Sequence, residues 1–151
     1  MSGKKIAIVT GASSGMGREM VYLLADHFAA LEEIWVIARR KDRLEELVGK
    51  VPVSLRILPF DLSGEEDLRM LSGLLKQEQP NVKILVNGAG YGKTGAAGTI
   101  PGSLSTGMVR LNDEALVAVT EMVLPYISGN SRIIQFASAA AFMPQPGFAV
   151  Y

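Results

Sequence analysis

The chain has 151 residues, of which 48% are hydrophobic and 20% charged, so we expect one ordinary domain with a folded core rather than disorder. The 15 Lys and Arg residues balance 15 Asp and Glu residues, which argues against nucleic acid and anionic membrane surfaces as partners. The absence of cysteine excludes disulfides and thiol catalysis, and the lack of a long apolar leader leads us to expect a cytoplasmic protein.

The first expected elements are a strand and a helix joined by a glycine-rich loop. The apolar run 6–9 predicts a short buried strand, and helix-spaced apolar residues predict a helix over 15–29. In the loop, Gly11 permits a sharp turn, Gly15 lets backbone approach a ligand, and Gly17 lets the helix pack closely on the sheet. The free N–H groups and the dipole at the start of the helix favour an anion, so the loop is a candidate phosphate site.

The spacing of the glycines distinguishes this loop from other phosphate loops. It has neither the Gly-Lys-Ser/Thr ending of a P-loop nor the G-x-G-x-x-G pattern. The pattern that it does have, Thr10-Gly11-x-x-x-Gly15-x-Gly17, resembles the classical short-chain dehydrogenase/reductase family; the alternative is an ordinary glycine-rich connection. The resemblance implies a dinucleotide site formed here by Gly11, Ser13, Ser14, Gly15, Met16 and Gly17.

The second expected strand, 33–38, is followed directly by basic residues. In dinucleotide folds an acidic residue at this position binds the ribose 2′-hydroxyl of NAD, whereas arginine accommodates the 2′-phosphate of NADP. Here Ala38 stands in place of the acid, and Arg39 and Arg40 follow. A guanidinium offers paired donors to phosphate and keeps its charge. We therefore predict NADP (NADPH) as the cofactor; a solvated basic turn is the alternative.

Two capping-box patterns predict the next helices. Asp42 with Glu45 predicts a short helix through about residue 48, and Ser63 with Glu66 predicts a longer one to about residue 78. The run 53–60 between them predicts the third strand.

The third and fourth strands both end in residues that the resemblance assigns to the cofactor. The fourth strand, 82–87, leads into Asn-Gly-Ala-Gly, where the family usually has Asn-Asn-Ala-Gly, so Gly88 replaces the second asparagine. The glycine-rich segment 91–102 that follows is either a gate or a plain surface loop. The implied contacts are Asp61, Leu62, Asn87, Ala89 and Gly90; without the resemblance, Asp61 reads as a turn residue near a helix cap.

The last expected elements are a helix over 103–125 and a fifth strand over 131–137. The resemblance implies that Asn112 orders a water in a proton relay, that Ser138 hydrogen-bonds the substrate oxygen, and that Tyr151 transfers the proton. Tyrosine titrates near pH 10, so this role needs positive charge nearby. The family's lysine would fall four residues beyond Tyr151, and we expect the 151-residue form by itself to lack activity.

Strands alternating with helices predict an α/β fold, a doubly wound parallel sheet of Rossmann type in the order 3-2-1-4-5. Residues 1–151 would form one dinucleotide-binding domain, truncated at its C-terminus. The resemblance implies hydride transfer between NADP(H) and a small-molecule carbonyl or alcohol, with no metal, in a protein that forms homo-oligomers at full length. The alternatives are a non-catalytic NADP-binding sensor or regulatory module and an assembly fragment that binds nothing.

Overall fold

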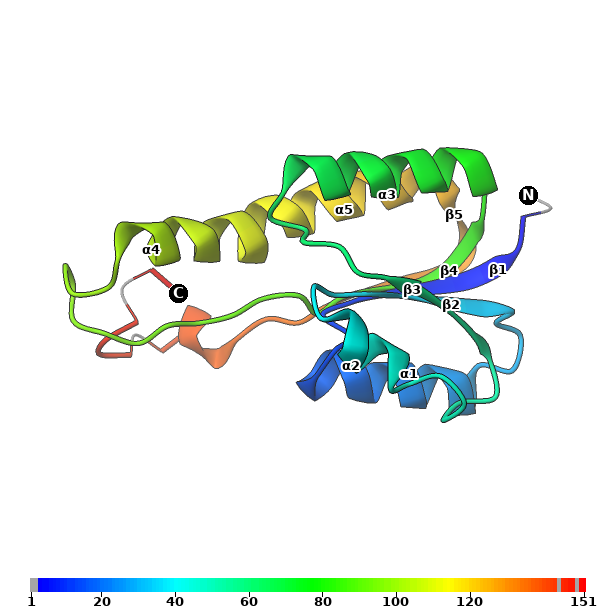
Figure 1. Ribbon diagram of the computed structural model, residues 1–151, viewed down its shortest axis with the longest axis horizontal. Coiled ribbons are helices and arrows are strands. Elements are labelled where there is room, and N and C mark those ends of the chain that lie inside the picture. The colour runs from blue at the N-terminus through cyan, green and yellow to red at the C-terminus, as the bar shows by residue number, and fades with distance from the viewer. Residues whose placement is uncertain (1–2, 144, 149) are drawn as a thin grey trace.

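The computed structural model describes residues 3–143, 145–148 and 150–151, which form a five-stranded parallel sheet with helices on both faces (Figure 1). The strand order is β3-β2-β1-β4-β5, so the predicted doubly wound sheet is confirmed. The strands are β1 (Lys5–Thr10), β2 (Glu33–Ile37), β3 (Ser54–Leu58), β4 (Asn81–Asn87) and β5 (Ile127–Gln135). The α-helices are α1 (Gly15–His27), α2 (Lys41–Glu45), α3 (Glu65–Glu78), α4 (Gly102–Val109) and α5 (Ala115–Val123).

The central strand β1 sends alternate side chains into two separate apolar layers, because successive residues of a strand face opposite sides of the sheet. Ile6 and Ile8 are fully buried in the layer beneath α3 and α5. Ala7 and Val9 are fully buried in the opposite layer, which α1 and α2 cover (Figure 1). Burial on both faces explains why the sequence of β1 is continuously apolar instead of alternating.

The capping-box predictions for α2 and α3 are wrong. The residues that precede these helices are Arg40 and Gly64, and neither provides a side-chain cap. Ser63 instead belongs to the preceding turn, where its N–H and hydroxyl donate to Asp61 Oδ1 at 3.0 and 2.6 Å. Asp67 Oδ2 accepts the Asp61 N–H at 2.6 Å, which fixes the path of the chain from β3 into α3.

The helix expected over 103–125 is interrupted near its middle. A π-helical turn (Arg110–Glu114) separates α4 from α5, and a 3-10 turn (Leu124–Tyr126) ends the segment. Within the part of the chain that the structure describes, no helix is long and apolar enough to span a membrane.

The fifth strand is displaced from its predicted range. It begins at Ile127 rather than at residue 131, and it ends at Gln135 rather than at residue 137. Its register against β4 shifts between the partners of Val82 and Ile84, and Asn130 lies in the left-handed region with φ 69°. Asparagine tolerates this conformation better than most residues, so an irregularity is accommodated inside the strand.

Candidate cofactor-binding site

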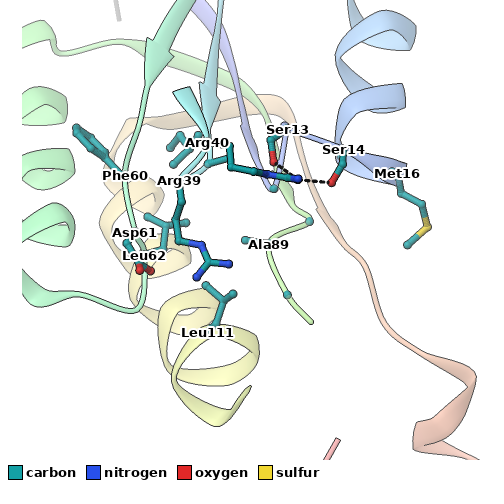
Figure 2. Close-up of a pocket in the computed structure, with 17 residues that line it drawn as sticks. Ser13, Ser14, Met16, Arg39, Arg40, Phe60, Asp61, Leu62, Ala89 and Leu111 are labelled. Atoms are coloured by element: carbon teal, nitrogen blue, oxygen red, sulfur yellow. Dashed lines mark hydrogen bonds between the residues drawn. The ribbon is translucent and has the colours of Figure 1, made fainter. Parts of the chain in front are cut away.

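A cleft of about 340 Å³ lies beyond the carboxyl ends of β1, β2, β3 and β4 (Figure 2). This is the point where the strand order reverses, which is where open α/β sheets bind their ligands. The cleft is lined by every residue assigned above to cofactor binding except Asn87. It is also lined by five residues that the sequence did not assign: Ile37, Ala38, Phe60, Gly88 and Leu111. Ala38, Phe60 and Gly88 directly adjoin residues assigned to the cofactor, whereas Ile37 and Leu111 do not.

The three glycines of the first loop meet different steric demands. At Gly11, which has φ 70°, a Cβ would lie 2.4 Å from the carbonyl oxygen of Gly88. At Gly17, a Cβ would lie 2.4 Å from the carbonyl oxygen of Gly11, so this glycine packs α1 against the loop itself. Gly15 has φ 55° but no atom within 4 Å of its Cβ position, so space is open beside it. The glycines at 11 and 17 close the loop, and the glycine at 15 leaves room at its rim.

Thr10 connects the ends of the two central strands, a role that the sequence analysis missed. Its Oγ1 accepts the N–H groups of Gly88 and Ala89, both at 3.0 Å, and donates to the carbonyl oxygen of Val86 at 3.4 Å. In the sequence Thr10 stands directly before Gly11, at the end of an apolar strand and at the start of the glycine pattern. The bonds hold the loop after β4 beside the loop after β1.

The two arginines after β2 point in different directions. Arg40 Nη2 donates to the hydroxyls of Ser13 and Ser14 at 3.0 and 2.9 Å, which links the β2 edge of the cleft to the glycine loop (Figure 2). The Arg39 side chain turns away from these serines and extends along the cleft (Figure 2). Both arginines are exposed, and together they place two permanent positive charges at the cleft.

An ion-pair cluster beside the cleft joins α1 to the segment after α2. Arg18 Nη2 lies 3.0 Å from Glu46 Oε2, and Arg43 Nη1 lies 3.1 Å from Glu46 Oε1. The hydrogen bond from Arg18 holds the pKa of the Glu46 carboxyl below its ordinary value, and the charge of Arg43 acts in the same direction. The helix α1 follows the glycine loop, and α2 follows the two arginines. The cluster therefore links the two helices that adjoin these two sides of the cleft.

Asn87 lies behind the cleft instead of lining it. Its buried amide donates to Thr120 Oγ1 at 2.9 Å, and that hydroxyl donates to the carbonyl oxygen of Leu116 at 2.7 Å. The asparagine therefore fastens α5 to the end of β4.

The structure does not bring the three catalytic candidates into one hydrogen-bonded group. Asn112 lies in the π-helical turn, where its Oδ1 accepts the Tyr91 N–H at 3.0 Å and its Nδ2 donates to the Tyr91 carbonyl at 2.9 Å. Ser138 Oγ accepts the N–H of Ala140 at 3.2 Å. Tyr151 packs on Phe148, with ring centroids 5.4 Å apart. Among the described residues, no hydrogen bond joins these candidates to one another, and none of them lines the cleft.

Metal ligands are not clustered in the described ranges, 3–143, 145–148 and 150–151: no group of three or more His, Asp or Glu residues there could hold an ion. The cleft itself offers backbone N–H groups, hydroxyls, two guanidiniums and one carboxylate, Asp61. The N–H groups, hydroxyls and guanidiniums are donors that suit a phosphorylated ligand, whereas the Asp61 carboxylate is an acceptor.

The sheet order and the cleft at its switch point define a doubly wound α/β domain of the nucleotide-binding class. Residues 5–151 match the family model for short chain dehydrogenases, and the chain belongs to that family.

Individual relatives cover nearly the whole chain. An uncharacterized oxidoreductase of Staphylococcus saprophyticus, SSP1627, is 31% identical over 150 residues, and the alignment covers 97% of this chain and 60% of the relative. The NADP-dependent 3-hydroxy acid dehydrogenase YdfG of Shigella flexneri is 29% identical, with coverage of 97% and 59%. A short-chain dehydrogenase from Sphingobium yanoikuyae, solved in complex with NADPH, superposes with a TM-score of 0.86 at 27% identity, with coverage of 97% and 58%. The chain thus spans about three fifths of the length of these relatives.

Proposed function

We propose that this chain forms the cofactor-binding part of an NADP-dependent oxidoreductase, which transfers a hydride between NADP(H) and the carbonyl or alcohol group of a small molecule. The observation that carries the proposal is the pair of arginines at the cleft, with Ala38 where NAD-binding folds place an acid. The YdfG relative is named as NADP-dependent, and the Sphingobium structure contains NADPH, which supports the same choice of cofactor.

The cleft residues form three groups, each of which suits a different part of the cofactor: the pyrophosphate, the 2′-phosphate or the adenine. The N–H groups of the glycine loop and the start of α1 suit the pyrophosphate, since these residues line the cleft and a helix N-terminus favours an anion. Arg39, Arg40 and the hydroxyls of Ser13 and Ser14 suit the 2′-phosphate, because they supply charge-assisted and neutral donors. Asp61 and Leu62 lie beyond β3 and would border the adenine.

The catalytic roles proposed for this chain belong to Ser138, Tyr151 and Asn112. The cofactor supplies the hydride when bound. The Ser138 hydroxyl would hold the substrate oxygen, and the Tyr151 hydroxyl would give or take its proton. The hydrogen bonds between Asn112 and Tyr91 would fix the turn beside the cleft, where Asn112 would order a relay water.

The test is a pair of fluorescence titrations of the complete protein with NADPH and NADH. We expect NADPH to bind at least roughly tenfold more tightly, which corresponds to about 1.4 kcal/mol. Equal affinity for the two nucleotides would overturn the assignment of the arginines. NADPH oxidation in the presence of aldehydes, ketones and 3-oxo acids then tests hydride transfer. Tight NADPH binding without oxidation by any of these carbonyl compounds would support the cofactor site and refute the proposed hydride transfer.

A further inference from the structure

Gly88, Ala89 and Gly90 form one wall of the cleft. On the side away from the cleft, this wall contacts the end of β1 and the residue that follows β5. A Cβ placed on Gly88 would lie 2.9 Å from the carbonyl oxygen of Thr10 and 3.0 and 3.1 Å from Cδ2 and Cε2 of the Phe136 ring. The chain after β4 is therefore confined between the end of β1 and an aromatic ring at the end of β5. The contact with the Thr10 oxygen is closer than real Cβ atoms essentially ever come, and the two ring contacts are tighter than most, so a side chain at position 88 would require a shift.

Hydrogen bonds fix the same segment in the other directions. Thr10 Oγ1 accepts the N–H groups of Gly88 and Ala89 at 3.0 Å each. The N–H of Phe136 donates to the carbonyl oxygen of Asn87 at 3.1 Å, which aligns the ring with the residue that follows Asn87. Thr10 thus holds the wall by polar contacts, and Phe136 holds it by packing. Phe136 is partly buried and packs against the apolar layer on the α1 and α2 side of the sheet.

We infer that Phe136 is a positioning residue, matched to Gly88, that sets how far the Gly88–Ala89–Gly90 wall projects toward the cofactor; this rests on the proposed function. Without the ring, the wall loses its backing and can move away from the cleft. With a methyl group on Gly88, the wall is pushed off both Thr10 and Phe136. Either change alters the width of the cleft, and Phe136→Ala does so without replacing a residue that lines it.

The experiment is a double-mutant cycle in the complete protein, with NADPH affinity and the urea midpoint of unfolding measured for each variant. The variants are Phe136→Ala, Gly88→Ala and the double variant, with Phe136→Leu in case the alanine variant folds poorly. We expect NADPH to bind roughly five- to tenfold more weakly in each single variant. We also expect the loss in the double variant to be smaller than the product of the two, because the added methyl group then meets no ring.

The control is Ile134→Ala, which removes a partly buried β5 side chain from the same apolar layer and is not among the nearest neighbours of a Cβ at Gly88. It should lower the urea midpoint and leave NADPH affinity unchanged. The inference is overturned if Phe136→Ala and Phe136→Leu bind NADPH like the wild type, or if the two single effects multiply without coupling. Absence of nicotinamide nucleotide binding in the wild type is a different result, which would overturn the proposed function itself.

Discussion

Arg39 and Arg40 are neighbours in the sequence, but their guanidinium groups do not share the same hydrogen-bond partners. Arg40 is fixed by two hydroxyls of the glycine loop, whereas Arg39 extends along the cleft without sharing those partners (Figure 2). Arg40 therefore presents a guanidinium that is oriented before any ligand arrives, together with two serine hydroxyls. A pre-oriented charge loses less conformational entropy on binding than a free one.

We predict that replacing both arginines by alanine weakens NADPH binding by about 1–3 kcal/mol and leaves NADH binding nearly unchanged, because only NADPH carries a 2′-phosphate. The measurement is fluorescence titration with each nucleotide. Lys41→Ala is the matched control, since Lys41 is adjacent and cationic but pairs with Glu45 at 3.5 Å instead of lining the cleft. Parallel loss of both nucleotides in the double variant would contradict the assignment.

A second prediction concerns Gly15, where open space adjoins the cleft and φ is 55°. Gly15→Val should abolish measurable NADPH binding, because the branched side chain fills the space proposed for the pyrophosphate. Circular dichroism should still show the native mixture of helix and strand.

The chain provides a close control for the strain that valine introduces. Gly49 also has a positive φ, 79°, with no atom within 4 Å of its Cβ position, and it does not line the cleft. Gly49→Val should destabilise the fold through a comparable backbone penalty and keep NADPH binding. Undiminished binding in Gly15→Val would show that the phosphate lies elsewhere.

At the scale of the elements, the sequence predicted the existence and order of all five strands, because apolar runs are local features, but it misplaced the bounds of β5. It did not foresee the π-helical turn between α4 and α5. The apolar spacing continues through this turn, and the structure has Asn112 paired there with the backbone of Tyr91, a residue distant in the sequence. The capping box at Ser63 was wrong for a local reason: Ser63 donates to Asp61, two residues earlier, instead of capping the helix.

The Asn112 contacts lead to a third prediction. Asn112→Ala removes both hydrogen bonds to Tyr91 and should lower the free energy of unfolding by about 1–3 kcal/mol, since it leaves backbone groups unpaired. Urea unfolding measures this loss. Asp113→Ala, which changes an exposed side chain in the same turn, should have little effect on stability. Equal urea midpoints for the two variants would show that the bonds between Asn112 and Tyr91 do not stabilise the fold.

The link between α1 and α2 predicts a pH dependence. The folded-state pKa of Glu46 is below its ordinary value of 4.5, chiefly because of the hydrogen bond from Arg18. The stabilisation is therefore present above about pH 4.5 and is lost as the pH falls through the lower, folded-state pKa. Urea midpoints of wild type and Glu46→Gln should differ at pH 7 and converge as the pH falls below this range. A difference that persists unchanged in acid would exclude this cause.

At the scale of the whole molecule, β5 has β4 on one side and no described strand on the other. Ile133, in this strand, has 38% of its surface exposed. A polypeptide limited to residues 1–151 would present this apolar edge to water, where it can pair with other chains. We predict negligible carbonyl reduction by a polypeptide of these residues alone and clear turnover by a form that continues to the length of the relatives. The measurement is NADPH oxidation at equal protein concentration, and comparable rates would refute the proposed catalytic roles.

The order of the strands also affects how the nascent chain folds during synthesis. The central strand β1 finds one neighbour, β2, soon after it is made, but its other neighbour, β4, ends only at Asn87. At 5–20 residues per second, the ribosome needs roughly 4–15 s to pass from β1 to the end of β4. During that time a strand with five fully or nearly fully buried residues in the native sheet has one edge open to other chains. We therefore expect yield in cells to depend on chaperones that bind early, and to respond to changes in translation speed between residues 10 and 87 more than to changes after them.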